Sequence, residues 1–285
     1  MKKGNRRPAE TPPLQRLREI MATLRDPQGG CPWDREQTFA SLVPHTLEEA
    51  YEVAAAIEQD HLGDLCDELG DLLFQVVFYA RLAEERGLFD LDDVATGICT
   101  KLERRHPHVF GNTKVADAAA QSVAWESLKA EERQARNPES GILDGVATSL
   151  PALTRAAKLQ RRAARAGFDW PSIGPVMDKV VEELDELRVE LDNGGGDVRC
   201  RDEVGDLLFV CVNLARHAGV DPEQALRGSN RKFERRFRYI ESELRRRGVD
   251  IAEASLSQMD ALWDEAKARE TDTTQIGNEG RRDEA

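Results

Sequence analysis

Hydrophobic positions recur at steps of three and four residues along most of the chain. Over residues 14–25, leucines, an isoleucine and a methionine return with this spacing, which is typical of one face of an α-helix. The same pattern predicts further helices near 46–58, 64–86, 90–105, 119–136, 151–166, 175–192, 198–218, 222–247 and 256–270. The two-residue alternation of a strand is absent from the sequence. The pattern therefore predicts an all-α fold.

Local signals predict where some of these helices begin and end. Thr46 and Glu49 have the spacing of a capping box, which would begin a helix at Thr46. Gly87 would end the helix that starts near Asp64. The segment Cys-Pro-Trp-Asp at 31–34 is expected to be a loop with an anchoring tryptophan.

The chain contains an internal repeat. Glu-Glu-Ala-Tyr-Glu at 48–52, followed by Glu-Leu-Gly-Asp at 68–71, corresponds to Glu-Glu-Leu-Asp-Glu at 182–186, followed by Glu-Val-Gly-Asp at 203–206. Further matching blocks follow in the same order: 71–74 with 206–209, 101–105 with 232–236, and Trp125 and Lys129 with Trp263 and Lys267. A repeat of this kind predicts two tandem helical-bundle domains.

The turn composition around Asn137 and Pro138 places a linker at 137–150 between domains at 14–136 and 151–270. Disordered tails are expected at 1–13 and 271–285, which are polar or rich in proline.

Composition and charge narrow the function. Apolar residues make up 40% of the 285 residues and the net charge is −13, so generic binding of polyanions such as nucleic acid is disfavoured. Neither a membrane-spanning run nor the apolar core of a signal peptide is present in the sequence. The cysteines are scattered and form no Cys-x-x-Cys motif, which favours reduced thiols in a cytoplasmic protein.

The repeated acidic motif predicts a metal site. Glu183 and Glu186 are three residues apart, as are Glu203 and Asp206, so each pair lies on one helix face. Two helices joined by a short loop pack antiparallel, which allows the four carboxylates to meet. Among apolar neighbours, several ionised carboxylates would be unfavourable unless a cation joined them. Oxygen ligands without His or Cys suit Mg²⁺, with Mn²⁺ as a substitute.

The first copy predicts a second site of the same kind. It holds the corresponding carboxylates Glu49, Glu52, Glu68 and Asp71. Gly70 and Gly205 follow the same pattern, and each costs roughly 1 kcal/mol in a helix interior. Close approach of another backbone beside the site would explain these glycines.

Cations and an aromatic ring accompany the second acidic motif. Lys179 lies one turn before Glu183, and Lys232 and Arg236 share a helix face. Trp263 lies one turn before Lys267. Carboxylates for a metal, cations for phosphate and a ring for a base together describe a nucleoside triphosphate pocket. Hydrolysis there would depend on positioning and on electrostatic stabilisation of a phosphoryl transition state.

At this point the chain resembles a known family. Glu-Glu-x-x-Glu followed by Glu-x-x-Asp is similar to the signature of the all-α nucleotide pyrophosphohydrolases. The duplication, with the segments at 31–34, 102–110 and 167–170, resembles the MazG family over about 14–270. The resemblance implies Mg²⁺-dependent hydrolysis of nucleoside triphosphates to monophosphate and pyrophosphate, for sanitation or regulation of nucleotide pools. It also implies a homodimer in which the C-terminal copy is catalytic.

The resemblance implies roles for individual residues. The metal would be held by Glu183, Glu186, Glu203 and Asp206. The nucleotide would be bound by Lys179, Lys232, Arg236, Trp263 and Lys267. Arg199 stands near the nucleotide where a lysine is expected, which keeps the charge and alters the geometry. Glu182 is an alternative activator of the water.

Several alternatives stay open at this stage. Lys232 and Arg236 could be surface charges paired with Glu234 or Glu241, and Trp263 could be a core anchor. A di-iron carboxylate bundle would use Glu-x-x-His, which occurs at 103–106 but not in the second copy. A nucleic-acid-binding or scaffold protein is suggested by the basic stretch at 231–247, although glutamates dilute its charge.

Overall fold

The computed structural model describes residues 11–113, 117–139, 141–194 and 196–279. The described residues are helical and form no strand, which confirms the expected all-α fold. The chain divides into two compact units, unit 1 (Met1–Arg136) and unit 2 (Asn137–Ala285). The two units are described separately below.

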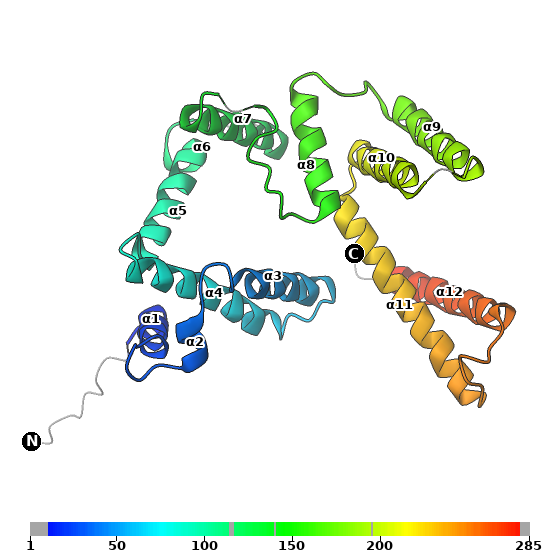
Figure 1. The fold of residues 1–285 in the computed structure, drawn as a ribbon, viewed down its shortest axis with the longest axis horizontal. Helices are drawn as coiled ribbons and strands as arrows, with labels where there is room; N and C mark the ends of the chain where they lie inside the picture. Colours follow the sequence, from blue (N-terminus) through cyan, green and yellow to red (C-terminus); the bar gives the residue numbers. More distant parts are fainter. Residues whose placement is uncertain (1–10, 114–116, 140, 195, 280–285) are drawn as a thin grey trace, which may run out of the picture. The chain divides into compact units, whose positions relative to one another are not determined.

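Unit 1 contains the first seven helices (Figure 1). They are α1 (Pro13–Leu24), α2 (Pro32–Glu36), α3 (Val43–Glu58), α4 (Leu65–Glu85), α5 (Leu91–Arg105), α6 (Pro107–Phe110) and α7 (Ala118–Arg136). The central helix is α4, because α1, α3 and α5 all pack against it.

The core of unit 1 lies between α1, α4 and the segment before α3. Its buried members are Met21, Leu42, Val77, Phe78 and Leu82. Phe78 and Leu82 are four residues apart on α4 and lie beside Val77, so one apolar face of α4 packs against α1. Burial of each large side chain contributes about 1.5–3 kcal/mol relative to exposure.

Two local predictions for unit 1 were wrong. Residues 32–36 form the short helix α2 rather than only a loop, because Pro32 occupies the first helical position that proline favours. Helix α3 begins at Val43, and the Thr46 hydroxyl donates to the carbonyl of Leu42 rather than capping a helix. A capping box is formed instead by Asp90 at the start of α5.

Unit 2 contains the remaining five helices. They are α8 (Ala152–Arg165), α9 (Ile173–Asp192), α10 (Asp197–His217), α11 (Pro222–Arg246) and α12 (Leu256–Glu279). Helix α10 packs against α8, α9 and α11, and α12 packs against α11. Helix α12 continues to Glu279, beyond residue 270, where the hydrophobic pattern ends.

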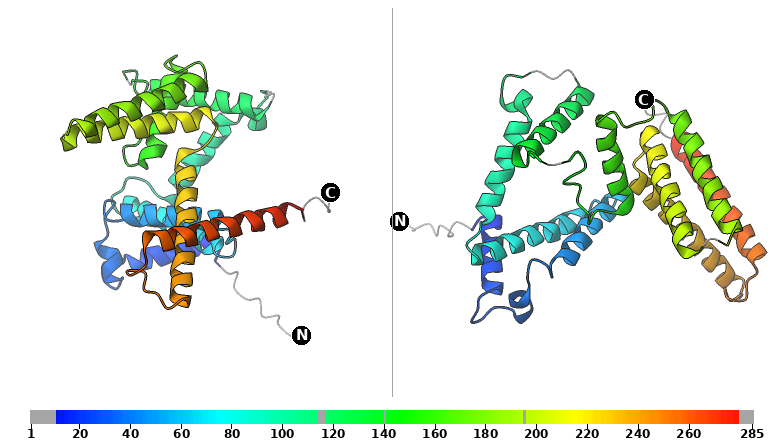
Figure 2. Two further views of the ribbon diagram at one scale, coloured as in Figure 1. Left: turned by 90° about the vertical axis from the view of Figure 1, so that its right-hand side faces the viewer. Right: turned by 45° about the horizontal axis from the view of Figure 1, so that its top comes forward.

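The two units repeat one arrangement. Helices α3 and α4 lie side by side in unit 1, as α9 and α10 do in unit 2 (Figures 1 and 2). Helices α1 and α8 occupy equivalent places against α4 and α10. Each unit therefore presents one acidic motif on a pair of adjacent helices.

Candidate functional site

Two adjacent helices bring three carboxylates together in unit 2. Glu183 belongs to α9, whereas Glu203 and Asp206 belong to α10. One oxygen from each carboxylate lies within 4.8 Å of the other two. Glu183 is buried, Glu203 is half-buried and Asp206 is exposed. This group, named the unit 2 cluster, is thus held by the helix pair and open to solvent at one side chain.

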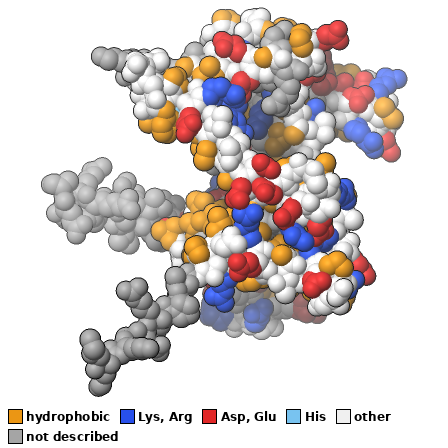
Figure 3. Space-filling model, turned by 90° about the vertical axis from the view of Figure 1, so that its left-hand side faces the viewer, with side chains coloured by type: hydrophobic (Ala, Val, Ile, Leu, Met, Phe, Trp, Pro, Cys, Tyr) orange, Lys and Arg blue, Asp and Glu red, His pale blue; other side chains and the backbone are white. Residues whose placement is uncertain are grey.

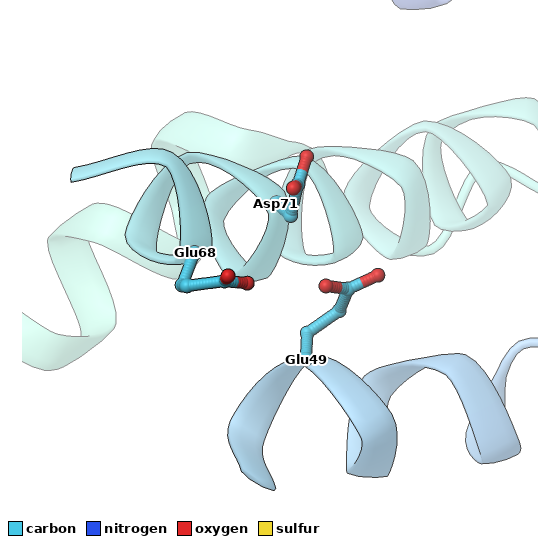
Figure 4. A group of neighbouring side chains, drawn as sticks. All are labelled: Glu49, Glu68 and Asp71. Carbon is cyan, nitrogen blue, oxygen red and sulfur yellow. The ribbon is translucent and has the colours of Figure 1, made fainter. Parts of the chain in front are cut away.

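The same arrangement occurs in unit 1. Glu49 from α3 and Glu68 and Asp71 from α4 have oxygens within 4.8 Å of one another. Figure 4 shows the Glu49 carboxylate near that of Glu68, with Asp71 one helical turn further along α4. This group is named the unit 1 cluster.

The fourth carboxylate of each predicted set lies outside its cluster. Glu52 and Glu186 are exposed and follow Glu49 and Glu183 by three residues. The carboxyl group of Glu52 is still hydrogen-bonded to that of Glu49. Together with partial burial, the charge of Glu186 raises the pKa of Glu203. The structure therefore brings three of the four together and keeps the fourth within electrostatic reach.

The crowding of carboxylates changes their acidity. Partial burial raises the pKa of Glu49, and the charge of Asp71 raises it further. Partial burial also raises the pKa of Glu203, and the charge of Glu186 adds to this effect. A raised carboxyl pKa shows that the ionised form is disfavoured relative to water. A bound cation would reverse this.

The donors of both clusters fit a hard divalent cation. Each cluster offers carboxylate oxygens only, and these are the ligands that Mg²⁺ and Mn²⁺ accept. Magnesium–oxygen distances are about 2.1 Å, so opposite ligands of an octahedral ion are about 4.2 Å apart. The oxygens of each cluster lie within 4.8 Å of one another, so only a small side-chain adjustment is needed to reach that geometry.

A lysine contacts the unit 2 cluster. The ammonium of Lys179 donates to Glu182 Oε1 at 2.8 Å and also lies 2.8 Å from Glu183 Oε1. These carboxylates, first Glu182 and then Glu183, raise the pKa of Lys179. Arg199 is exposed, and its Nη1 lies 3.7 Å from Glu190 Oε2.

The equivalent place in unit 1 holds a histidine. His45 precedes Glu49 by four residues, as Lys179 precedes Glu183. Its Nδ1 lies 3.8 Å from Glu48 Oε2. The two clusters thus share their carboxylates and differ in the cationic group beside them.

The remaining predicted nucleotide-binding residues lie on α11 and α12. The guanidinium carbon of Arg236 lies 5.2 Å from the ring centre of Trp263, which is within cation–π range. Trp263 also packs against the core cluster of Ile240, Leu244 and Leu262. Lys232 and Lys267 are exposed. Trp263 is therefore at once a core anchor and a support for Arg236.

The acidic and basic groups are carried by different helix pairs. Helix α9 packs on α10, and α11 packs on α12. Among the described residues, the unit 2 cluster contacts side chains of α9 and α10. Arg236 of α11 instead contacts Glu270 and Trp263 of α12.

The sequence reasoning missed two glutamates. Glu270 accepts hydrogen bonds from Arg236, at 3.0 Å from Nε and 2.7 Å from Nη2, and from Arg235 Nε at 2.7 Å. In unit 1, Glu132 binds Arg104 and Arg105 in the same way. Each glutamate follows the repeated tryptophan by seven residues, and this spacing could have identified both as part of the repeat.

The expected surroundings of the clusters were partly wrong. Leu73 and Val76 on α4 and Leu208 and Phe209 on α10 are exposed, and hydrophobic side chains lie open at several places on the face drawn in Figure 3. A Cβ at Gly70 or Gly205 would meet no atom within 4 Å. The expected close backbone approach therefore does not occur within the described residues.

The structure also bears on the alternatives. His106 Nδ1 lies 2.6 Å from the carbonyl of Leu102, and neither acidic cluster includes a histidine. Arg236 pairs with Glu270, whereas Glu234 pairs with Arg238. Four arginines of α11 thus pair with glutamates within the fold: Arg235, Arg236, Arg238 and Arg246. No helix in the described part of the chain combines the length and apolar character that crossing a membrane requires.

Comparison with known proteins relates this chain to one family. A profile of the MazG nucleotide pyrophosphohydrolase domain matches residues 37–110 and 174–240, and these segments contain both clusters. A nucleoside triphosphate pyrophosphohydrolase from Escherichia coli (strain K12) is 50% identical over 260 residues, 91% of this chain and 98% of that protein. The nucleoside triphosphate pyrophosphohydrolase/pyrophosphatase MazG of Thermotoga maritima is 41% identical, over 89% of this chain and 95% of that protein.

A nucleoside triphosphate pyrophosphohydrolase from Mycobacterium tuberculosis is 38% identical over 156 residues, 54% of this chain and 46% of that protein. The two longer matches cover nearly the whole of each relative, and the duplicated acidic helix pairs account for the two segments that the profile matches. This chain belongs to the MazG nucleotide pyrophosphohydrolase family.

Proposed function

We propose that this chain hydrolyses nucleoside triphosphates, of the ribo or deoxy series, to the nucleoside monophosphate and pyrophosphate. The observation that carries the proposal is 50% identity over 98% of a relative that bears the name of this activity. The carboxylate clusters, each on a pair of adjacent helices, support it. In the cell the reaction would remove unwanted nucleotides or regulate their level.

The unit 2 cluster is the proposed catalytic centre. Glu183, Glu203 and Asp206 would hold Mg²⁺, or Mn²⁺ as a substitute, and Glu186 would join them by a side-chain rotation. A bound ion of this kind supplies positive charge to phosphate oxygens and lowers the pKa of water. The unit 1 set of Glu49, Glu52, Glu68 and Asp71 is a proposed second metal site.

The surrounding residues would bind and orient the nucleotide. Lys179, Arg199, Lys232, Arg236 and Lys267 supply cations for the phosphates. Trp263 offers a ring on which a base can stack. Glu182 is exposed beside Glu183, so we assign it the role of accepting a proton from the attacking water. These roles require that the phosphates of the nucleotide connect the acidic helix pair, α9 and α10, with the basic helix pair, α11 and α12.

We also propose that the chain functions as a homodimer. Val181 and Leu184 on α9 and Leu208 and Phe209 on α10 are large apolar side chains that are about half exposed. A second copy would bury them, and burial of apolar area contributes roughly 25 cal/mol per Å². Closed symmetric dimers are the commonest oligomers.

The domain boundaries are proposed at 14–136 and 151–270, with a linker at 137–150 and tails at 1–13 and 271–285, although residues 271–279 of the second tail belong to α12 in the structure. Residues 1–10 and 280–285 of these tails lie outside the described residues. The five cysteines are free, and they favour the proposed cytoplasmic location.

Pyrophosphate release tests the proposed activity. The full chain is incubated with Mg²⁺ or Mn²⁺ and a panel of canonical, deoxy and chemically damaged nucleoside triphosphates. Release of pyrophosphate and the matching monophosphate is expected. A panel that yields neither product with either metal would refute the proposal.

Matched variants identify the catalytic copy. Asp206→Asn removes one charge from the unit 2 cluster, and Asp71→Asn removes the equivalent charge from the unit 1 cluster. We expect Asp206→Asn to lower kcat by at least about 100-fold, which is the scale of losses around metal sites, and Asp71→Asn to act far less. The opposite order would move catalysis to unit 1.

A further inference from the structure

The ammonium of Lys179 is placed where it compensates the carboxylates that would receive a metal. Its Nζ lies 2.8 Å from Glu183 Oε1, and Glu183 is the most buried member of the unit 2 cluster. The contact joins residues one helical turn apart on α9. An incoming divalent cation therefore meets a carboxylate that already has a positive partner.

Within the described part of unit 1, no ammonium or guanidinium pairs with a carboxylate of the unit 1 cluster. His45 stands at the position of Lys179, and its nearest recorded carboxylate is Glu48, which is not a member of the unit 1 cluster. An imidazole, unlike the ammonium of a lysine, is not a permanent positive charge. The same carboxylate geometry is thus found with and without a fixed positive charge.

We propose that Lys179 is a built-in counter-cation that weakens metal binding to unit 2 until a triphosphate arrives, and that unit 1 takes up a divalent cation without such a requirement. The inference rests on the proposed function for the identity of the ligand. It assigns Lys179 a positioning role on Glu183 in addition to phosphate binding.

The physical basis is competition between positive charges. A lysine ammonium and a divalent cation cannot share one carboxylate without mutual repulsion, which is only partly screened near a protein surface. Lysine has a long flexible stem and no fixed donor geometry. Phosphate oxygens can therefore attract the ammonium away from Glu183, and the freed carboxylate then becomes available to the metal.

The first experiment measures Mn²⁺ alone binding to the full chain by electron paramagnetic resonance of the free ion. An Asp71→Asn background removes most of the binding by unit 1. Within it, Lys179→Met is expected to tighten Mn²⁺ binding by about tenfold, which corresponds to about 1.4 kcal/mol. The reverse exchange, His45→Lys in an Asp206→Asn background, is expected to weaken Mn²⁺ binding to unit 1.

Arg188→Met is the matched control, because it removes a positive charge from the same helix. Arg188 is exposed and pairs with Asp185 at 3.1 Å, outside the unit 2 cluster. It is expected to change Mn²⁺ affinity by less than about twofold, since exposed charges are screened by salt. Adding a non-hydrolysable triphosphate analogue should tighten Mn²⁺ binding more in the parent protein than in Lys179→Met.

The inference is overturned if Lys179→Met leaves the Mn²⁺ affinity unchanged or lowers it. It is also overturned if Arg188→Met raises the Mn²⁺ affinity as much as Lys179→Met does. Failure of the proposed function is a separate result. A chain that releases no pyrophosphate but binds Mn²⁺ more tightly after Lys179→Met would refute the activity and support this role of Lys179.

Discussion

Replacement of Glu270 by glutamine tests how Arg236 is held. The substitution keeps the shape of the side chain and removes the charge that faces Arg235 and Arg236. The side chain of Arg236 is 15% exposed and that of Arg235 is 61% exposed, so the two contacts with Glu270 contribute differently to stability. A hydrogen bond to a charged group contributes about 1.5–3 kcal/mol, whereas an exposed ion pair contributes about 0.2–1 kcal/mol.

Glutamine still accepts one hydrogen bond, so only part of this stabilisation is lost. We expect Glu270→Gln to lower the stability of unit 2 by about 1–2 kcal/mol. For a unit of this size that corresponds to a fall in Tm of roughly 2–8 °C. Differential scanning calorimetry of the full chain measures the shift.

Glu234→Gln is the matched control, because Glu234 is a glutamate in the same pair of helices, α11 and α12. Glu234 faces Arg238 at 3.3 Å, and both side chains are mostly exposed. Its loss should cost less than about 0.5 kcal/mol. Equal shifts in Tm for Glu270→Gln and Glu234→Gln would refute the claim that Glu270 is the anchor of Arg236.

Three further results are expected. Hydrogen bonds from Arg105 and Arg104 lower the pKa of Glu132 from 4.5 to about 2. The contribution of ionised Glu132 to stability is therefore complete above pH 4.5 and is lost as the pH falls towards 2. Tm measurements should detect this loss in the parent protein and not in Glu132→Gln. Asp169→Asn weakens the bidentate pair with Arg216, which is 15% exposed, and should cost about 1–3 kcal/mol; an unchanged Tm would contradict this. Chelation of the metal should abolish pyrophosphate release, and added Mg²⁺ should restore it. More Mg²⁺ should be needed as the pH falls through the raised pKa of Glu203, because metal ligands must be deprotonated. A Mg²⁺ requirement that does not change with pH would count against Glu203 as a ligand.

Much of the fold could be predicted from the sequence, since helical periodicity is a local property. The periodicity over 64–86 predicted α4, whereas its buried face, which includes Val77, Phe78 and Leu82, was identified only in the structure. Errors occurred where local signals compete. Thr46 matched a capping box, yet Pro44 already suits the first turn of a helix, and the Thr46 hydroxyl lies 3.0 Å from the Tyr79 hydroxyl of the neighbouring helix.

The candidate site was partly predictable for the same reason. Residues three apart on a helix share a face in any context, so Glu203 and Asp206 were expected to lie together, and they do. The partner of Arg236 was not predictable in this way. Glu270 lies 34 residues further along the chain, and only the packing of α12 on α11 selects it over the nearer Glu234.

The sequence by itself determined the all-helical fold, the duplication and the pairing of Glu68 with Asp71 and of Glu203 with Asp206, because all three follow from short-range spacing. Only the tertiary structure decided that Glu52 and Glu186 lie outside the clusters and that Glu270 holds Arg236. These are distances between side chains set by rotamers and helix packing. Patterns along one helix contain no information about which of several charged neighbours a side chain will reach.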